Sequence, residues 1–388
     1  MIFNSGGPLS PKVTFEFNGV EVNYHSVNYI ELELSENKHD ILTVQVSGIP
    51  HKAITDYIGA AVRFTVSSGA TRTQKFNGYV VYVEPESDTD APVIDNSMFY
   101  RAKIVCLGAS VAMKSTHQRV WSNTTIYKIA QELASKYRFS LDVLKDQFVI
   151  DRIVQANESD WEFLIRVCKT YGYSVTVHGT HMHVWDPFKA VGRRASYEEL
   201  VPVSKYSGPV PGMINKFIGT FGQITPSGSF YRYGLNPINN DGTIVGVIEP
   251  ESDNYTSFSG HSVVPKYSKT ITESVRSVEE AEKFIGAYKR QSFPFNVHVE
   301  IAAGAGNVPG GVVKITGYDS NFEGIWYVRS VRHMFSESSY ISELGISKDY
   351  NTSNQFYIPP VELAEVPPDS VFIDNTWRSE MERVNLYV

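Results

Sequence analysis

The chain has 388 residues, of which 42% are hydrophobic and 20% charged, and its formal net charge is −7. This length and composition predict a folded protein of two or three domains. The acidic balance, without any long run of Lys or Arg, excludes a dedicated nucleic-acid binder. No apolar stretch approaches the roughly 20 residues that a membrane span needs, so no membrane insertion is expected.

The two cysteines, Cys106 and Cys168, are too few for a disulfide framework or a zinc site of their own. Both lie in apolar patterns, and both are predicted to be buried small residues. The opening residues MIFNSGGPLSPK contain no basic segment followed by an apolar one, so no signal peptide is expected. Synthesis and assembly are therefore expected in a cytoplasm.

Residues 12–108 alternate apolar and polar side chains between turn residues, which predicts a barrel or sandwich of six or seven strands. The runs are 13–22, 29–36, 41–49, 61–68, 76–85 and 100–108.

The pattern then changes to two amphipathic helices. Residues 122–139 repeat apolar side chains at helical spacing. The second helix begins at Ser159, which forms an S-x-x-E capping box with Glu162, and ends at Gly172. A β-hairpin is predicted after this helix, on both sides of residues 178–180.

From about residue 200 short strands return, and a third helix is predicted at a second capping box formed by Ser277 and Glu280. Four further strands are predicted between 295 and 347. Residues 351–388 contain two proline pairs and isolated apolar residues, which is typical of an extended arm.

The charged residues between 155 and 187 are the first candidates for chemistry. Asp160 and Glu162 lie in the first helical turn, where the helix dipole and unpaired N–H groups favour carboxylates. The first turn of a capped helix is usually wet, so a pair of catalytic carboxylates is not expected there. Helix initiation explains both residues.

The histidines His178, His181 and His183 are the second candidate. His181 and His183 share one face of a strand, but zinc needs three or four ligands, and Asp186 has the wrong parity to join them. We therefore expect these histidines to face solvent at the hairpin. The glycine-rich stretches 208–212 and 304–311 have no helix behind them and are predicted to be turns. No catalytic, cofactor-binding or metal-binding residue is assigned.

The order of these elements resembles the tailed-phage baseplate hub superfamily, which includes late control protein D and the VgrG spike proteins of type VI secretion. The first shared pattern comprises Thr125, Ile129, Leu133, Gln155, Glu158, Ser159, Asp160, Phe163, Leu164, Arg166 and Gly172. The second comprises Pro309, Gly310, Gly324, Trp326, Val328, Val331 and His333. Together the patterns cover roughly residues 100–190 and 270–350.

The resemblance implies an α+β, mainly β fold with two tail-tube-like β-barrels, at 1–112 and 200–350. A helix-plus-hairpin insert domain (113–199) and an extended C-terminal arm (351–388) complete the expected organisation. Family members of this kind form trimeric rings with pseudo-six-fold symmetry, which join the hexameric tail tube to a three-fold spike or tail tip. The implied location is the baseplate of the virion tail, after assembly in the host cytoplasm.

The resemblance also implies partners and competing functions. Expected partners are a homotrimer, the tail tube protein, a spike or tail-tip protein, the tape-measure protein and baseplate wedge proteins, with DNA only as passing cargo. A tail-associated cell-wall hydrolase would need a carboxylate pair or a metal triad in a cleft. A host carbohydrate-binding tail protein would need exposed aromatic platforms. The sequence predicts neither, and no enzyme activity is expected.

Overall fold

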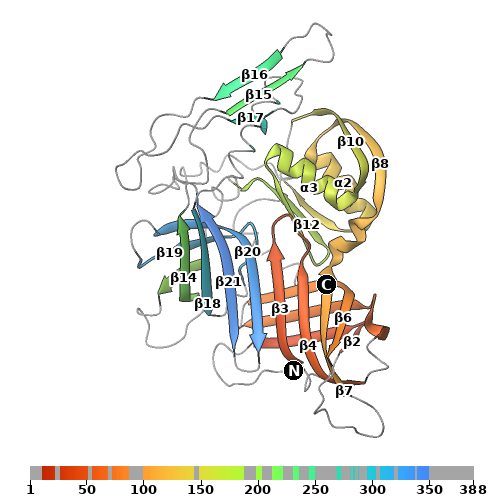
Figure 1. Ribbon diagram of the computed structural model, residues 1–388, viewed down its shortest axis with the longest axis vertical. Helices are drawn as coiled ribbons and strands as arrows, with labels where there is room; N and C mark the ends of the chain where they lie inside the picture. The colour runs from red at the N-terminus through yellow and green to blue at the C-terminus, as the bar shows by residue number, and fades with distance from the viewer. Residues whose placement is uncertain are drawn as a thin grey trace.

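The computed structural model of the chain is mainly β (Figure 1). The residues that it describes are 11–21, 27–50, 55–68, 72–86, 99–143, 148–187, 198–202, 212–221, 230–235, 244–249, 269–271, 280, 283–284, 287, 295–302, 306–318, 322–336 and 339–348. The predicted arm at 351–388 lies outside them.

The N-terminal unit is a curled sheet in the order β3-β4-β7-β6-β5-β1-β2. Its strands are β1 (Pro11–Phe17), β2 (Val20–Glu21), β3 (Val27–Ser35), β4 (Ile41–Pro50), β5 (Ala61–Ser68), β6 (Arg72–Glu86) and β7 (Phe99–Gly108), with a 3₁₀ turn at Thr55–Tyr57. Alternate side chains such as Ile30, Leu32 and Leu34 point into one core and are fully buried. The predicted strand alternation of this unit is confirmed.

The C-terminal unit is a closed six-stranded barrel. Its strands follow the order β19-β13-β14-β18-β21-β20, and an additional β19–β20 pairing closes the ring. They are β13 (Glu198–Pro202), β14 (Met213–Phe221), β18 (Phe295–Ala302), β19 (Val312–Ile315), β20 (Gly324–Ser336) and β21 (Tyr340–Lys348). Trp326, Val328, Leu344 and Ile346 belong to its core.

The two β units share one sheet, because β20 of the barrel pairs antiparallel with β3 of the N-terminal unit. Phe335 lies opposite Ile30 in this register, and Figure 1 shows the two strands side by side at the centre of the molecule. Since the outer edge of β3 is taken by β20, the N-terminal sheet continues into the barrel instead of closing on itself.

The insert follows a 3₁₀ segment at Ala109–Lys114 and contains both predicted helices, α2 (Ile126–Tyr137) and α3 (Asp160–Tyr171). The capping box of Ser159 and Glu162 is formed, and Gly172 ends α3 with φ 81°. The predicted hairpin is β11 (Ser174–His178) and β12 (His181–Trp185), to which β9 (Ser140–Val143) adds a parallel strand. The strands β8 (Thr116–Thr124) and β10 (Ile150–Ser159) form a separate pair.

A small sheet of β15 (Phe230–Leu235), β16 (Ile244–Glu249) and β17 (Lys269–Ile271) lies at the top of Figure 1. Of the third predicted helix, Glu280, Lys283, Phe284 and Ala287 are helical, and the rest lies outside the described residues.

The mainly β fold class with a closed barrel and a helix-plus-hairpin insert is confirmed. Within the part of the chain described above, no helix is long and apolar enough to cross a membrane.

Candidate functional site

Several residues of the first shared pattern lie at the start of α3, among them Glu158, Ser159 and Asp160. A bulge interrupts the β10–β8 pairing between Gln155 and Glu158, and Asn157 within it has φ 52°. The bulge places Ser159 as the helix cap, whose hydroxyl accepts a hydrogen bond from the backbone N–H of Glu162 at 3.2 Å. The local sequence therefore turns a strand directly into a capped helix.

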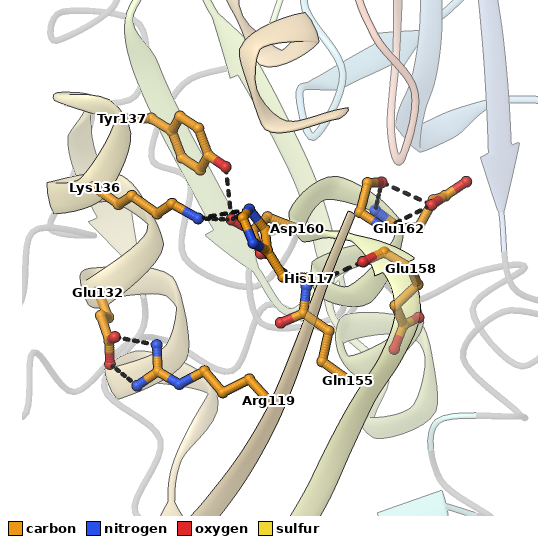
Figure 2. A network of polar contacts seen from close by, with 10 residues as sticks. His117, Arg119, Glu132, Lys136, Tyr137, Gln155, Glu158, Asp160 and Glu162 are labelled. Carbon is orange, nitrogen blue, oxygen red and sulfur yellow. Dashed lines mark hydrogen bonds and ion pairs between the residues drawn. The ribbon is translucent and has the colours of Figure 1, made fainter. Parts of the chain in front are cut away.

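Asp160, the next residue, lies at the centre of a polar network (Figure 2). Its carboxylate accepts hydrogen bonds from Lys136 Nζ at 2.6 Å, Tyr137 Oη at 2.6 Å and Gln155 Nε2 at 2.8 Å. His117 Nε2 lies 3.6 Å from the same carboxylate. Four side chains from three elements, α2, β8 and β10, thus point toward one carboxylate.

The expectation of a wet first turn is wrong for Asp160, which is 2% exposed. The last turn of α2 and the strands β8 and β10 cover it. Burial alone would raise the pKa of Asp160, but the hydrogen bonds from Gln155, Lys136 and Tyr137 outweigh it and lower this pKa. A carboxylate held ionised by three donors is a structural anchor between two helices and is poorly suited to accept a proton.

Arg166 holds the other side of the bulge. It forms a two-pronged ion pair with Glu158 and donates to the carbonyl of Val154 at 2.8 Å. Thr125 caps α2, since its hydroxyl accepts a hydrogen bond from the backbone N–H of Lys128 at 3.2 Å. Every polar residue of the first shared pattern therefore has a structural contact.

The prediction that the hairpin histidines face solvent is also wrong. His178, His181 and His183 are all buried. His178 Nδ1 lies 2.8 Å from Asp40 Oδ2 of the N-terminal unit, and His183 Nδ1 lies 3.3 Å from Asp142 Oδ2 of β9. His181 and His183 form a cluster with Asp142, a carboxylate that the sequence pattern did not indicate. Asp186 is not part of this cluster.

A second junction connects all three units at Glu36. Its carboxylate accepts hydrogen bonds from Ser174 Oγ at 2.9 Å and Tyr327 Oη at 2.7 Å, and it forms an ion pair with Arg329. Tyr327 Oη in turn accepts from Trp185 Nε1 at 3.0 Å. The hairpin and the barrel therefore meet on one side chain of the N-terminal unit.

At this junction the position of Gly310, a residue of the second shared pattern, requires glycine. It has φ 78°, and a Cβ there would lie 2.8 Å from Cε2 of Trp185, too close for any side chain. His333 of the same pattern is buried in the C-terminal unit and contacts Ser342 Oγ at 2.9 Å and Tyr340 Oη at 3.2 Å. These pattern residues also have packing roles.

A cleft of about 270 Å³ opens beside Glu36. Its lining comes from all three units and comprises Glu36, Asn37, Lys38, Lys169, Gly172, Tyr173, Ser174, Pro187 and Arg329. Among these described lining residues Glu36 is the one carboxylate, and it is engaged by Arg329. The described lining residues therefore do not include the carboxylate pair that a glycoside hydrolase needs.

Residues 40–207 match the family model of the phage tail baseplate hub. The resemblance to baseplate hub proteins is confirmed. The matched hub region contains both helices, the bulge, the Asp160 network and the histidine cluster.

Solved tail proteins share the fold at low sequence identity. The 43 kDa tail protein of prophage MuSo2 from Shewanella oneidensis has a TM-score of 0.62 and 13% identity, over 87% of this chain and 98% of that chain. A tail protein from Neisseria meningitidis MC58 has a TM-score of 0.64 and 10% identity, over 87% and 97%.

An Escherichia coli component of the type VI secretion system, described as similar to the T4 phage tail proteins gp27 and gp5, has a TM-score of 0.54 and 11% identity. It is matched over 86% of this chain and 76% of its own length. No curated protein sequence matches significantly. At these identities the solved structures show that the chain shares the fold of these tail proteins.

Proposed function

We propose that this protein is a structural baseplate hub of a phage tail. Three copies would form a ring with pseudo-six-fold symmetry that joins the hexameric tail tube to a three-fold spike or tail tip. The observation that carries the proposal is the continuous thirteen-stranded sheet, in which β20 and β3 join two β units of one chain edge to edge. Two such units in each of three chains give the six that a hexameric tube ring requires.

The proposal divides the chain at 1–112, 113–199, 200–350 and 351–388. Three hydrophobic clusters support the first three divisions, since each cluster draws nearly all its residues from one of them. The proposed partners are the tail tube, spike or tail-tip, tape-measure and wedge proteins, with DNA passing through the ring. The proposed location is the virion baseplate after assembly in the host cytoplasm.

One exposed apolar patch is suited to a contact between copies. Tyr79, Val81 and Tyr82 of β6 are 43%, 39% and 52% exposed, on a strand of the N-terminal sheet. Exposed apolar and aromatic side chains grouped on a sheet are typical of protein–protein interaction surfaces. We assign this patch to the contact with a neighbouring copy in the ring.

Light scattering of the purified full chain tests the ring. The expected mass is three times the 43.5 kDa of one chain. Tyr82→Glu is expected to shift the distribution toward monomer, while Val120→Glu, at an exposed site on β8 of the insert, leaves it unchanged. A stable monomer or hexamer of the unmodified chain contradicts the proposed symmetry.

We also propose that the hub has no enzyme activity of its own. Asp160 is held ionised by its donors, and the cleft at Glu36 lacks a second carboxylate among the described residues that line it. Peptidoglycan zymography is the direct test, and a cleared band at the mass of the chain contradicts the proposal.

A further inference from the structure

The three-stranded sheet of the insert has one apolar and one polar face. On the apolar face Val143, Val175, Val177, Met182 and Val184 belong to the hydrophobic cluster of the two helices. The opposite face is mostly polar, because strand residues alternate between faces. It comprises Ser140, Asp142, Ser174, Thr176, His178, His181 and His183, together with Trp185, whose indole N–H is bound to Tyr327.

This polar face is covered by the N-terminal unit. Asn37 pairs with the edge of β11, since its backbone N–H donates to Val175 O at 2.8 Å and its side chain accepts from Val175 N at 3.1 Å. The Ser174–Glu36 and His178–Asp40 contacts extend the same interface. Polar groups buried in this way need partners, because water is excluded.

Three of these side chains converge. Asp142 and His183 are direct neighbours in the parallel β9–β12 register, and His181 lies two residues before His183 on the same face. One donor atom from each of the three lies within 4.8 Å of the others. The exposed fractions are 2% for Asp142, 7% for His181 and 2% for His183.

The contacts of His181 and Ser140 indicate which nitrogen of His181 carries the proton. The hydroxyl of Ser140 can donate to Thr180 O at 3.4 Å, so its oxygen is available to accept a hydrogen bond from Nδ1–H of His181, with which it is in contact. Nε2 of His181 is then the unprotonated nitrogen. Among the described residues neither this Nε2 nor Asp142 Oδ1 has a hydrogen-bond partner, although both atoms are buried.

We propose that Asp142, His181 and His183 bind a divalent transition-metal ion, with zinc as the best match. Two imidazoles and one carboxylate are a common zinc ligand set. The 3.3 Å from His183 Nδ1 to Asp142 Oδ2 also fits, since zinc bonds of about 2.0–2.1 Å give tetrahedral edges of about 3.3 Å. Ser140 has the position of the outer partner that orients a ligating histidine.

A cation suits the charges of this cluster. A bound dication takes neutral imidazoles and an ionised carboxylate, and its charge compensates the burial of that carboxylate.

The proposed ion has a structural role. Its ligands come from β9 and β12, two strands that are about forty residues apart in sequence (Ser140 and His181 are 41 apart), and they lie next to the interface with the N-terminal unit. Binding would therefore stabilise the insert sheet at the surface where the two units meet. Asp142 supplies the carboxylate ligand that the spacing of Asp186 from the histidines excludes on their own strand. This inference does not depend on the proposed hub function.

The test uses the tag-free full chain, treated with chelator, dialysed and titrated with Zn²⁺ and separately with Co²⁺. We expect one equivalent of Zn²⁺ per chain, a higher melting temperature, and a visible Co²⁺ spectrum typical of tetrahedral nitrogen and oxygen ligands. Asp142→Asn and His181→Gln should each weaken Zn²⁺ binding by more than roughly 100-fold. His333→Asn, at a buried histidine of the other unit, is the matched control and should bind normally.

The Co²⁺ spectrum of the unmodified chain keeps the test decisive if a variant fails to fold. A Co²⁺ spectrum of the hydrated ion alone, or no Zn²⁺ binding, overturns the proposal and indicates that water fills the cluster. Zn²⁺ binding that Asp142→Asn leaves unchanged overturns the assignment of the ligands.

Discussion

Asp160 and Asp142 are two aspartates of the same insert, and both are 2% exposed. Their surroundings shift their pKa values in opposite directions. Asp160 accepts hydrogen bonds from an ammonium, a phenol and an amide, and its pKa is lowered. Asp142 faces the nitrogens of two histidines, has one oxygen without a hydrogen-bond partner, and its pKa rises to about 7. Burial alone therefore does not set the charge of a carboxylate, because the donors that face it decide the outcome.

The comparison also separates two kinds of buried polar site. The Asp160 network is complete in the protein itself, so it can anchor α2 to α3 without any further component. The Asp142 cluster is incomplete in hydrogen-bonding terms, which is typical of a site that takes an ion or water. The following changes test this difference, from the largest expected effect to the smallest.

Asp160→Ala should lower the free energy of unfolding by about 3 kcal/mol, because it leaves the amide of Gln155 buried without its acceptor and removes the partner of Lys136. Urea denaturation measures the change. Glu132→Ala is the control, since its ion pair with Arg119 is about half exposed and should contribute less than about 0.5 kcal/mol. Equal effects of the two substitutions would show that the Asp160 network is not an anchor.

His333 is a buried titratable group whose hydrogen bonds involve the hydroxyls of Ser342 and Tyr340 and the backbone of Asn307. Burial lowers its pKa from 6.5 to about 3, so the unfolded chain binds more protons between these values. The free energy of unfolding should therefore fall as the pH falls through this window, by about 2 kcal/mol between pH 6.5 and 5. Urea midpoints of the unmodified chain and of His333→Asn should diverge over this range, and parallel pH profiles would contradict the assignment.

Lys136→Met should raise the pKa of Asp160 and cost about 1 kcal/mol at neutral pH, since Lys136 is partly exposed and its ion pair is screened. In the unmodified chain the contribution of Asp160 is present above its unfolded-state pKa of 3.8 and is lost as the pH falls through the lower folded value. The variant should lose it at higher pH. Carboxyl NMR titration gives the pKa directly, and an unchanged value would assign its lowering to Gln155 and Tyr137 alone.

Asp142→Asn, measured in excess chelator, should change the free energy of unfolding by less than about 1 kcal/mol. The amide has the shape of the carboxylate and brings N–H donors to a cluster that has lone pairs without donors. Urea denaturation alongside Asp160→Ala makes the comparison. A loss as large as that of Asp160→Ala would mean that Asp142 is a complete anchor in the metal-free protein.

The sequence predicted well what depends on near neighbours. The Ser159–Glu162 capping box and the Gly172 stop lie within one helix, and the strands of the two β units alternate with a clear period of two. The strands β8 and β10 were missed, because the polar segments THQRVWSNT and IDRIVQANES do not alternate and β10 contains a bulge.

The surroundings of the candidate sites could not be predicted in the same way. Asp160 is dry because Lys136 and Tyr137 arrive from another helix, and His178 is buried by Asp40, which lies 138 residues away. Asp142 lies beside the histidines because the short strand β9 pairs in parallel with β12. Four residues are too few to show the apolar–polar alternation that predicts a strand. Parity within one strand excluded Asp186 but gave no information about a neighbouring strand.

The pairing of β3 with β20 also imposes an order on biosynthesis. Glu31 and Arg332, which face each other across this junction, are 301 residues apart. At roughly 5–20 residues per second, a ribosome needs about 15–60 s to supply the partner of β3 after β3 has emerged. During that interval the nascent chain presents an apolar strand with an unsatisfied edge, which is the feature that chaperones bind and that aggregates recruit. Yield in cells should therefore depend on chaperone capacity more steeply than the equilibrium stability of the finished fold would indicate.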